Sequence, residues 1–469
     1  MDDNLFIDIS AQEVRDGSWV DRVAYDWKKG NMGIPSMVPE LDYQDPELEA
    51  CVNNMLNSNI SYERGDTAVF RLMGASDDMA SITARVLEER GIKSRTVLFM
   101  TDRGDDIVRL LNKVYGEKAL DGLTVDSLSG LTERYDAILD TFQEKGKGHW
   151  MLSYPAYKPA KHSKASVLTD LVSQAVGRAT RRLKPLTKGD ERRVLSWDLW
   201  HNPEQVSLEE MNEVLETKLT LDQFRKISFG AMSVPASVLY DRAMSNPRVQ
   251  AFLEASKSGK LVRYESESGT DLTFSLDGRP IILDRDDMQN LALGGTGEVY
   301  ERITNKPNGE AFATPVEGSV NGVVVFNAPL STGSDRVVGP YKIYFENGLV
   351  TKVEGSNEAG LKVLKDVTGL VPRKFPESVD ALAAHGLRRL VGEVAIAGLN
   401  PVLDQAYKAG LLSSAYPSTI ISEKLADHFA VGTGFGKEAM FDVGDHHGVF
   451  VPHTDFMTGT ENKKVTLIG

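Results

Sequence analysis

Cysteine is almost absent from this sequence, since Cys51 is the one cysteine among 469 residues. A lone cysteine excludes an intrachain disulfide framework and any cluster of thiolate metal ligands. Long apolar runs are also missing: residues 97–100 and 323–326 are far shorter than the roughly 20 residues that cross a bilayer. The acidic opening MDDNLFIDIS lacks the basic region of a secretory signal. We therefore expect a cytoplasmic protein whose metals, if it binds any, are held by oxygen and imidazole ligands.

Positive charge is in deficit along the chain. Lysine and arginine number 53 against 67 aspartates and glutamates, which gives a formal net charge of -14. This balance argues against nucleic acid or an anionic membrane as the main partner. The one basic cluster, residues 178–188, is interpreted as a solvated helix face.

Motifs that identify several common enzyme classes are missing as well. The turn at residues 74–78 (GASDD) lacks Gly-x-Gly-x-x-Gly, and its two acids would repel a pyrophosphate. The glycine-rich segments 294–297 and 432–436 lack the Lys-Ser/Thr of a P-loop and are interpreted as tight turns. Gly-x-Ser-x-Gly and His-Glu-x-x-His are absent. We therefore expect neither a nucleotide site nor a serine-hydrolase or zincin site.

The N-terminal part of the chain alternates between strand and helix patterns. Residues 1–60 are predicted to be an irregular arm, and residues 61–258 an α/β domain. Strand-helix-strand-helix order is typical of a parallel sheet with right-handed crossovers. The predicted strands are residues 67–73 and 95–100, and the predicted helices are residues 77–90 and 105–114.

A shift in composition at residues 256–269 marks a domain boundary near residue 258. Beyond it, short strand patterns alternate with glycine turns, including the hairpin signal Asn347-Gly348. Residues 259–469 are therefore predicted to form an α+β domain with a mixed sheet. Its predicted strands include residues 271–276, 319–326, 341–345 and 349–353.

The candidate chemistry of this domain begins with the segment VFVPHTDFM, residues 449–457. On an extended strand, His453 and Asp455 point to the same side about 7 Å apart, so both can reach one small cation. A hydrogen-bonded structural pair is the competing interpretation. The metal interpretation therefore depends on further acidic and imidazole groups in the last third of the chain.

Such groups are present. Four of the eight histidines fall between His428 and His453, and Gly-Glu steps at Glu310 and Glu393 open strand-like segments. Glu423 and His428 are five residues apart, so both can serve one site only if a turn lies between them. Four carboxylates with two imidazoles suit a pair of divalent ions such as zinc, cobalt or manganese. The mixed sheet of this domain is accordingly predicted to carry the metal site.

Six blocks of this region resemble one known family, the dinuclear metallo-aminopeptidases related to aminopeptidases T and S. The blocks are GEAFATPVEGSVNG (309–322), SGTDLTFSL (268–276), FENG (345–348), VGEVAIAG (391–398), EKLADHFAVG (423–432) and HTDFM (453–457). The resemblance is dense over the C-terminal domain and looser over GDTAVFRLMGASDD near the N-terminus.

The resemblance implies a set of metal ligands for two divalent ions. They are Glu310, Glu393, Glu423, His428, His453 and Asp455. Glu393 would bridge the ions, and Glu393 and Glu310 would act as the catalytic carboxylates. The resemblance also implies a two-domain, cytoplasmic homodimer that acts broadly on peptide N-termini.

Two features depart from the family pattern. Phe435 stands where the family usually has a tyrosine that stabilises the transition state, and losing one such donor typically costs about 10²–10³ in rate. The long N-terminal arm and the segment Asp445-His446-His447 have no family counterpart. These departures affect the expectation of peptide hydrolysis more than that of metal binding.

Three functions follow from these residues. The first is a metal-dependent hydrolase, an aminopeptidase in which a metal-bound water attacks the scissile carbonyl. The second is a ring-cleaving dioxygenase, similar to dihydroxypyridine dioxygenases, with one iron(II) on His428, His453 and Asp455 and a small aromatic substrate. The third is a metal-binding or assembly protein without turnover.

Overall fold

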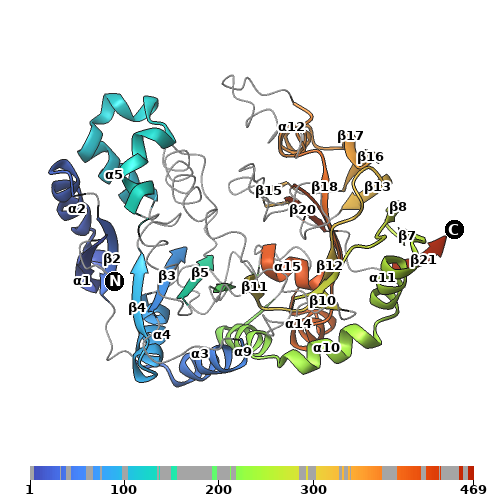
Figure 1. Ribbon diagram of the computed structural model, residues 1–469, viewed down its shortest axis with the longest axis horizontal. Coiled ribbons are helices and arrows are strands. Elements are labelled where there is room, and N and C mark those ends of the chain that lie inside the picture. Colours follow the sequence, from blue (N-terminus) through green and yellow to red (C-terminus); the bar gives the residue numbers. More distant parts are fainter. Residues whose placement is uncertain are drawn as a thin grey trace. The chain divides into compact units, whose positions relative to one another are not determined.

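The computed structural model divides into two compact units (Figure 1), which are residues 1–206 with 301–306 and residues 207–300 with 307–469. None of the described helices is both long and apolar enough to cross a membrane. The structure describes residues 5–31, 33–38, 44–59, 67–73, 77–97, 104–134, 137, 149–155, 193–197, 212, 218–284, 292–293, 303–326, 330–331, 336–337, 340–371, 388–412, 419–432, 434, 454–457 and 463–468.

The first unit is built on a seven-stranded sheet with the order β1-β2-β4-β3-β5-β6-β11. All of its strand pairs are parallel except β2 with β4, which are antiparallel. The four elements predicted between residues 67 and 114, and the parallel pairing of their strands, are therefore confirmed. The strands are β1 (Phe6–Ser10), β2 (Ile34–Val38), β3 (Thr67–Met73), β4 (Lys93–Val97), β5 (His149–Pro155), β6 (Arg193–Trp197) and β11 (Ile303–Lys306). The helices are α1 (Ala11–Asp16), α2 (Trp19–Lys28), α3 (Pro46–Asn59), α4 (Asp77–Glu89), α5 (Gly104–Tyr115) and the 3-10 helices η3 (Glu117–Gly122) and η4 (Val125–Leu128).

Residues 1–60, expected to be irregular, instead contain five regular elements, β1 to α3. The helical signal was present: Trp19, Val23 and Trp27 recur every four residues and are buried on one face of α2. The Trp27 indole also donates a hydrogen bond to the carbonyl oxygen of Gly33, 3.0 Å away. Trp19 and Trp27 therefore belong to the core of the first unit.

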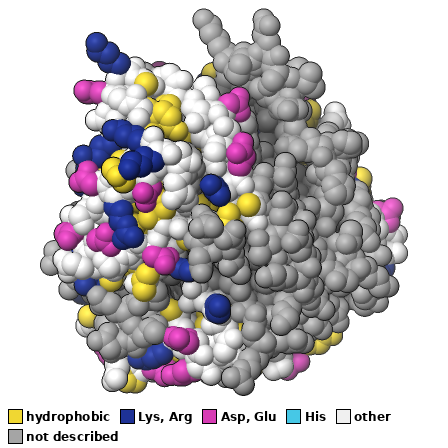
Figure 2. Space-filling view, turned by 60° about the vertical axis from the view of Figure 1, so that its left-hand side comes forward, with side chains coloured by type: hydrophobic (Ala, Val, Ile, Leu, Met, Phe, Trp, Pro, Cys, Tyr) yellow, Lys and Arg dark blue, Asp and Glu magenta, His cyan; other side chains and the backbone are white. Residues whose placement is uncertain are grey.

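Charges of both signs are interspersed on the face of the molecule shown in Figure 2. Ion pairs of the first unit include Arg22 with Glu13 at 3.3 Å and Lys113 with Asp21 at 2.7 Å. Residues 178–188, the basic cluster of the sequence, lie outside the described residues.

The second unit contains two six-stranded sheets. One has the order β17-β16-β13-β8-β7-β21, and the other has the order β10-β9-β12-β18-β19-β20. The first comprises β7 (Leu261–Ser266), β8 (Asp271–Ser275), β13 (Asn321–Phe326), β16 (Tyr341–Glu346), β17 (Leu349–Gly355) and β21 (Lys463–Ile468). The second comprises β9 (Ile281–Leu283), β10 (Ala292–Leu293), β12 (Ala311–Ala313), β18 (Val391–Ile396), β19 (His428–Val431) and β20 (Thr454–Met457). The short strands β14 (Leu330–Ser331) and β15 (Arg336–Val337) form a separate pair.

The prediction of a mixed sheet in this part of the chain is wrong. All strand pairs of the two six-stranded sheets are antiparallel among the described residues. Where connections are short, as at Asn347 and Gly348 between β16 and β17, the chain has to reverse direction, which gives an antiparallel pair. The four strands predicted from residue 271 to residue 353 are present.

The two sheets of the second unit enclose a shared apolar core. Aromatic rings connect them: Phe429 of β19 lies 5.1 Å from Tyr264 of β7, centroid to centroid, and Phe456 of β20 lies 5.4 Å from Phe326 of β13. Because side chains alternate along a strand, His428, which precedes Phe429, points to the opposite face of the second sheet. That opposite face is where the acidic residues and His428 lie.

The remaining helices of the second unit are α9 (Leu221–Met232), α10 (Ala236–Ser245), α11 (Pro247–Ser258), α12 (Glu358–Val367), α14 (Pro401–Lys408) and α15 (Thr419–Leu425). The sequence assigned the first three to the N-terminal domain, but they belong to the second unit. The reason is packing, because α11 lies against β7, β9 and β21 of that unit.

Candidate metal centre

Glu393 lies in β18, a strand whose residues are all buried. Val394 and Ile396 belong to the apolar core, so Glu393 and Ala395 face the other side of the sheet. The register pairs Glu393 with Ala430 and Ala395 with His428. His428 is therefore two cross-strand pairs along the sheet from Glu393, on the same face.

The imidazole of His428 is completely buried, and its Nε2 lies 3.1 Å from Oε1 of Glu393. Its Nδ1 lies 3.4 Å from the carbonyl oxygen of Ala426. A proton on Nδ1 would direct the Nε2 lone pair at the carboxylate. A lone pair and a carboxylate repel each other at this distance unless a cation or a proton lies between them.

Glu310 reaches the same point from the residue before β12. Gly309 has a φ of 135°, and a Cβ atom there would lie 2.6 Å from the backbone nitrogen of Asn400. The Asn400 side chain in turn donates to the carbonyl oxygen of Asn308 at 2.8 Å. Close packing of the two backbones thus requires a glycine at position 309. The same packing fixes the backbone position from which the Glu310 side chain extends.

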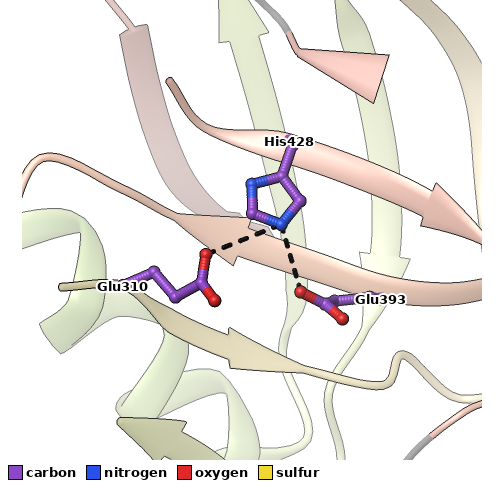
Figure 3. Close-up of side chains that lie close together, drawn as sticks. All are labelled: Glu310, Glu393 and His428. Atoms are coloured by element: carbon purple, nitrogen blue, oxygen red, sulfur yellow. Dashed lines mark hydrogen bonds and ion pairs between the residues drawn. The ribbon is translucent and has the colours of Figure 1, made fainter. Parts of the chain in front are cut away.

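The three side chains point toward one another from β12, β18 and β19 (Figure 3). Oε2 of Glu310 lies 3.7 Å from Nε2 of His428, and one ligand atom from each of the three residues lies within 4.8 Å of the others. Bonds of about 2.0–2.2 Å to a tetrahedral ion set its ligand atoms about 3.3–3.6 Å apart. Oε2 of Glu310 is buried and has no hydrogen-bond partner among the described residues. The three residues therefore fit a divalent cation.

A buried lysine lies beside this triad. Nζ of Lys424 contacts Oε1 of Glu310 and lies 2.7 Å from Oε1 of Glu423. It also lies 3.0 Å from Oδ2 of Asp284. Lys424 is thus completely enclosed by carboxylates.

Electrostatics distinguish Glu310 from an ordinary carboxyl. Burial raises the pKa of Glu310 well above its usual value, and the charges of Glu423 and Glu393 raise it further. Lys424 and His428 act in the opposite direction without cancelling the shift. Burial alone would lower the pKa of Lys424, but the surrounding carboxylates outweigh it and raise that pKa well above its usual value. By count, the four carboxylates of this cluster outnumber its one lysine.

A second buried acid directly precedes His428. Oδ1 of Asp427 accepts a hydrogen bond from the backbone nitrogen of Ala397 at 2.8 Å, and Oδ2 accepts one from the Tyr264 hydroxyl at 2.8 Å. Arg248 forms an ion pair with Oδ2, and Nζ of Lys463 lies 3.7 Å away. This acid connects α11, β7 and β21 to the start of β19.

The structure brings together three of the six expected ligands, Glu310, Glu393 and His428. Glu423 lies in α15 and contacts Lys424, and the turn that its spacing from His428 required is present at residues 426–427. The register pairs Asp455 with Ala430, in the row of Glu393, but its side chain is outside the description. The expected ligand His453, the substituted position Phe435 and residues 445–447 also lie outside the described residues.

Sequence reasoning missed Lys424 and Asp284. Lys424 directly follows a predicted ligand, which was a usable signal because a lysine in a buried segment requires carboxylate partners. Asp284 belongs to no motif. Its backbone nitrogen donates to the carbonyl oxygen of Glu310 at 3.0 Å, a contact that only the sheet creates.

Comparisons with known proteins agree with this site. A family model described as thermophilic metalloprotease (M29) matches residues 147–370, a segment that contains Glu310. The chain is 25% identical to aminopeptidase AmpS of Bacillus subtilis over 216 residues, so the match spans 44% of each protein and less than half of that relative.

Solved structures share the fold. AmpT from Thermus thermophilus superimposes with a TM-score of 0.57 at 17% identity, over 90% of this chain and 95% of that one. A 2,5-dihydroxypyridine dioxygenase from Pseudomonas putida gives a TM-score of 0.47 at 13% identity, over 90% and 93% of the two chains, a likeness from which no function follows. Taken together, the chain is similar to thermophilic metalloproteases (M29) over residues 147–370 and to aminopeptidase AmpS over 216 residues, and its fold is similar to that of AmpT.

Proposed function

We propose that the protein is a metal-dependent aminopeptidase that releases N-terminal residues from peptides. The observation that carries this proposal is the convergence of Glu310, Glu393 and His428 on one point, with an unpartnered carboxylate oxygen directed at it. Similarity to a metallopeptidase family over residues 147–370 supports the reaction class. A divalent ion held there would lower the pKa of a bound water and polarise a peptide carbonyl.

The side chains of the site have separate parts in this proposal. Glu393 and Glu310 hold the cation position from neighbouring strands, and one of these carboxylates takes the proton released by the attacking water. The contact between Nδ1 of His428 and the carbonyl oxygen of Ala426 fixes the imidazole orientation. Burial of all three side chains excludes bulk water, which strengthens every electrostatic contact in the site.

We further propose two divalent ions, zinc, cobalt or manganese, with Glu393 as the bridge. Glu423, His453 and Asp455 complete the ligand set in this proposal. The backbone register supports Asp455, because it occupies the same cross-strand row as Glu393. The four carboxylates of the cluster outnumber its one lysine, which supports more than one bound cation. A cytoplasmic homodimer is part of the same proposal, and sedimentation of the purified protein checks the dimer.

The test is elemental analysis of the purified protein together with hydrolysis of a panel of short peptides. We expect divalent metal in the wild type, release of N-terminal residues, and loss of both in Glu393→Ala and His453→Ala. Glu354→Ala is the matched control, since Glu354 is a partly exposed strand residue of the second unit that contacts Lys352 and Tyr344. Equal metal content in all four proteins would remove Glu393 and His453 from the site.

The dioxygenase alternative is decided by the same measurements. Two glutamates beside His428 do not match an iron held by two histidines and one aspartate. One iron per chain, with oxygen uptake on an aromatic diol and no peptide hydrolysis, would replace the aminopeptidase proposal.

A further inference from the structure

Lys424 has a position unusual for a lysine next to a metal site. Its ammonium is completely buried and contacts three carboxylates, from Glu310, Glu423 and Asp284. Three carboxylates match the three N–H donors of an ammonium group in number. The chain therefore supplies its own cation inside the carboxylate cluster.

Glu310 connects this ammonium to the metal triad. Its Oε1 contacts Nζ of Lys424, whereas its Oε2 faces Nε2 of His428 at 3.7 Å. Glu310 thus lies between two cation positions, in addition to Glu393, the proposed bridge between the ions. The first position is formed by Glu310, Glu393 and His428, and Lys424 fills the second.

We propose that Lys424 is a built-in competitor for the second metal ion, so that the two ions bind with unequal affinity. This inference rests on the proposed two-ion metallopeptidase. The first ion binds at the triad, where no ammonium has to be displaced. The second ion needs oxygens of Glu310 and Glu423 that the ammonium contacts, and two cations in one buried site repel each other.

Asp284 makes the exchange feasible. It is not among the ligands of the proposed ion pair, and Nδ2 of Asn308 donates to its Oδ1 at 3.3 Å. The ammonium can therefore keep Asp284 as a partner when Glu310 and Glu423 turn toward the second ion. The flexible four-carbon stem of lysine allows such a shift without a change in the fold.

The experiment is a calorimetric titration of the metal-free full chain with cobalt(II), followed by its visible spectrum. We compare the wild type with Lys424→Met, which removes the charge, and Lys424→Arg, which keeps it. Lys408→Met is the matched control, because Lys408 is an exposed lysine that pairs with Asp404. Circular dichroism of each metal-free protein checks the fold, and Lys424→Gln replaces Lys424→Met if the latter does not fold.

In the wild type we expect two binding steps whose dissociation constants differ by about tenfold or more. Lys424→Met should tighten the second step by about tenfold or more and change the first step less. Lys424→Arg and Lys408→Met should keep the wild-type separation. A wild type that binds one ion while Lys424→Met binds two is the extreme form of this result. Damage to the site would weaken binding, so the direction of the change separates competition from a structural role.

Two other outcomes overturn the inference. Two equal affinities in the wild type, or a second step in Lys424→Met that is unchanged or weaker, overturn it and leave the metallopeptidase proposal intact. If no variant and no wild-type sample binds cobalt stoichiometrically, the metal site itself fails, and the inference fails with it.

Discussion

Two buried acids of the same unit, Asp427 and Glu310, have opposite electrostatic states. Burial acts to raise the pKa of Asp427, yet Lys463, Arg248 and two hydrogen bonds bring that pKa below its usual value. Burial also raises the pKa of Glu310, and there the neighbouring carboxylates add to the shift. Depth alone therefore does not decide the state of a buried acid; the balance of its partners does.

Two adjacent residues, Asp427 and His428, have different roles: the first stabilises the fold and the second belongs to the candidate metal site. Asp427 is satisfied by hydrogen bonds and cations from the protein itself, so it connects strands and a helix. His428, the next residue, faces Glu310 and Glu393, whose charge the protein balances only in part. A cluster left with excess negative charge is where an external cation gains most.

The largest expected effect is on activity, from His428→Gln. The amide removes the imidazole ligand without adding charge, so peptide hydrolysis should fall by about 10³-fold or more, a larger loss than that of a single transition-state donor. The free energy of unfolding of the metal-free chain should change little. Peptide release and urea unfolding check the two halves of this prediction. Full activity in the variant would show that His428 is not a ligand.

Asp427→Ala should lower the stability of the fold and leave metal binding nearly unchanged. Removing the acid leaves Arg248 and Lys463 without their shared buried partner, which should lower the free energy of unfolding by about 3–5 kcal/mol. Urea unfolding measures the loss, and the metal content of the protein that remains folded should stay near that of the wild type. A stable Asp427→Ala that lost metal would make Asp427 part of the site.

The stability contributions of Glu310 and Asp427 should depend on pH in opposite ways. Because the folded pKa of Glu310 is raised, the unfolded carboxyl loses its proton above about pH 4.3 while the folded one retains it. The metal-free chain therefore loses stability as pH rises from there toward the folded pKa. Glu310→Gln removes this loss, so with a chelator present it should raise the free energy of unfolding more at pH 7.5 than at pH 5.

Asp427→Asn is the control for that experiment. Its folded pKa is lowered, so the stability from Asp427 is present above its unfolded pKa and is lost as pH falls through the folded one. The penalty of Asp427→Asn should therefore be full at pH 7 and shrink in acid. Parallel pH profiles for the two variants would contradict the contrast between the acids.

The smallest effect is expected from an exposed pair. Lys226 contacts Asp222 at 2.8 Å on the surface of α9, and both side chains are mostly exposed. Lys226→Gln should change the free energy of unfolding by about 0.5 kcal/mol or less, because water screens such a pair. A loss of stability as large as that of Asp427→Ala would mean that burial does not explain the different contributions of the two charged groups.

Much of the site was predictable from local sequence. The Gly-Glu steps at Glu310 and Glu393 are visible in the sequence, and strand alternation fixes the face to which Glu393 points. The turn between Glu423 and His428 also followed from their spacing. These features depend on nearby residues, which a sequence displays directly.

The remainder depended on contacts between distant residues. Lys424 and Glu310 are 114 positions apart, and neither period nor motif indicates that they meet. The antiparallel pairing of β18 with β12 and β19 comes from the packing of two sheets around one core. In α2, by contrast, the four-residue spacing of Trp19, Val23 and Trp27 was visible in the sequence and was overlooked.

The most direct test of the metal centre is a crystal structure of the cobalt-loaded protein with anomalous data collected at the cobalt edge. We expect an anomalous peak within bonding distance of Glu310, Glu393 and His428, and none beside Asp427. A cobalt-loaded crystal with no peak among those three side chains would contradict the account.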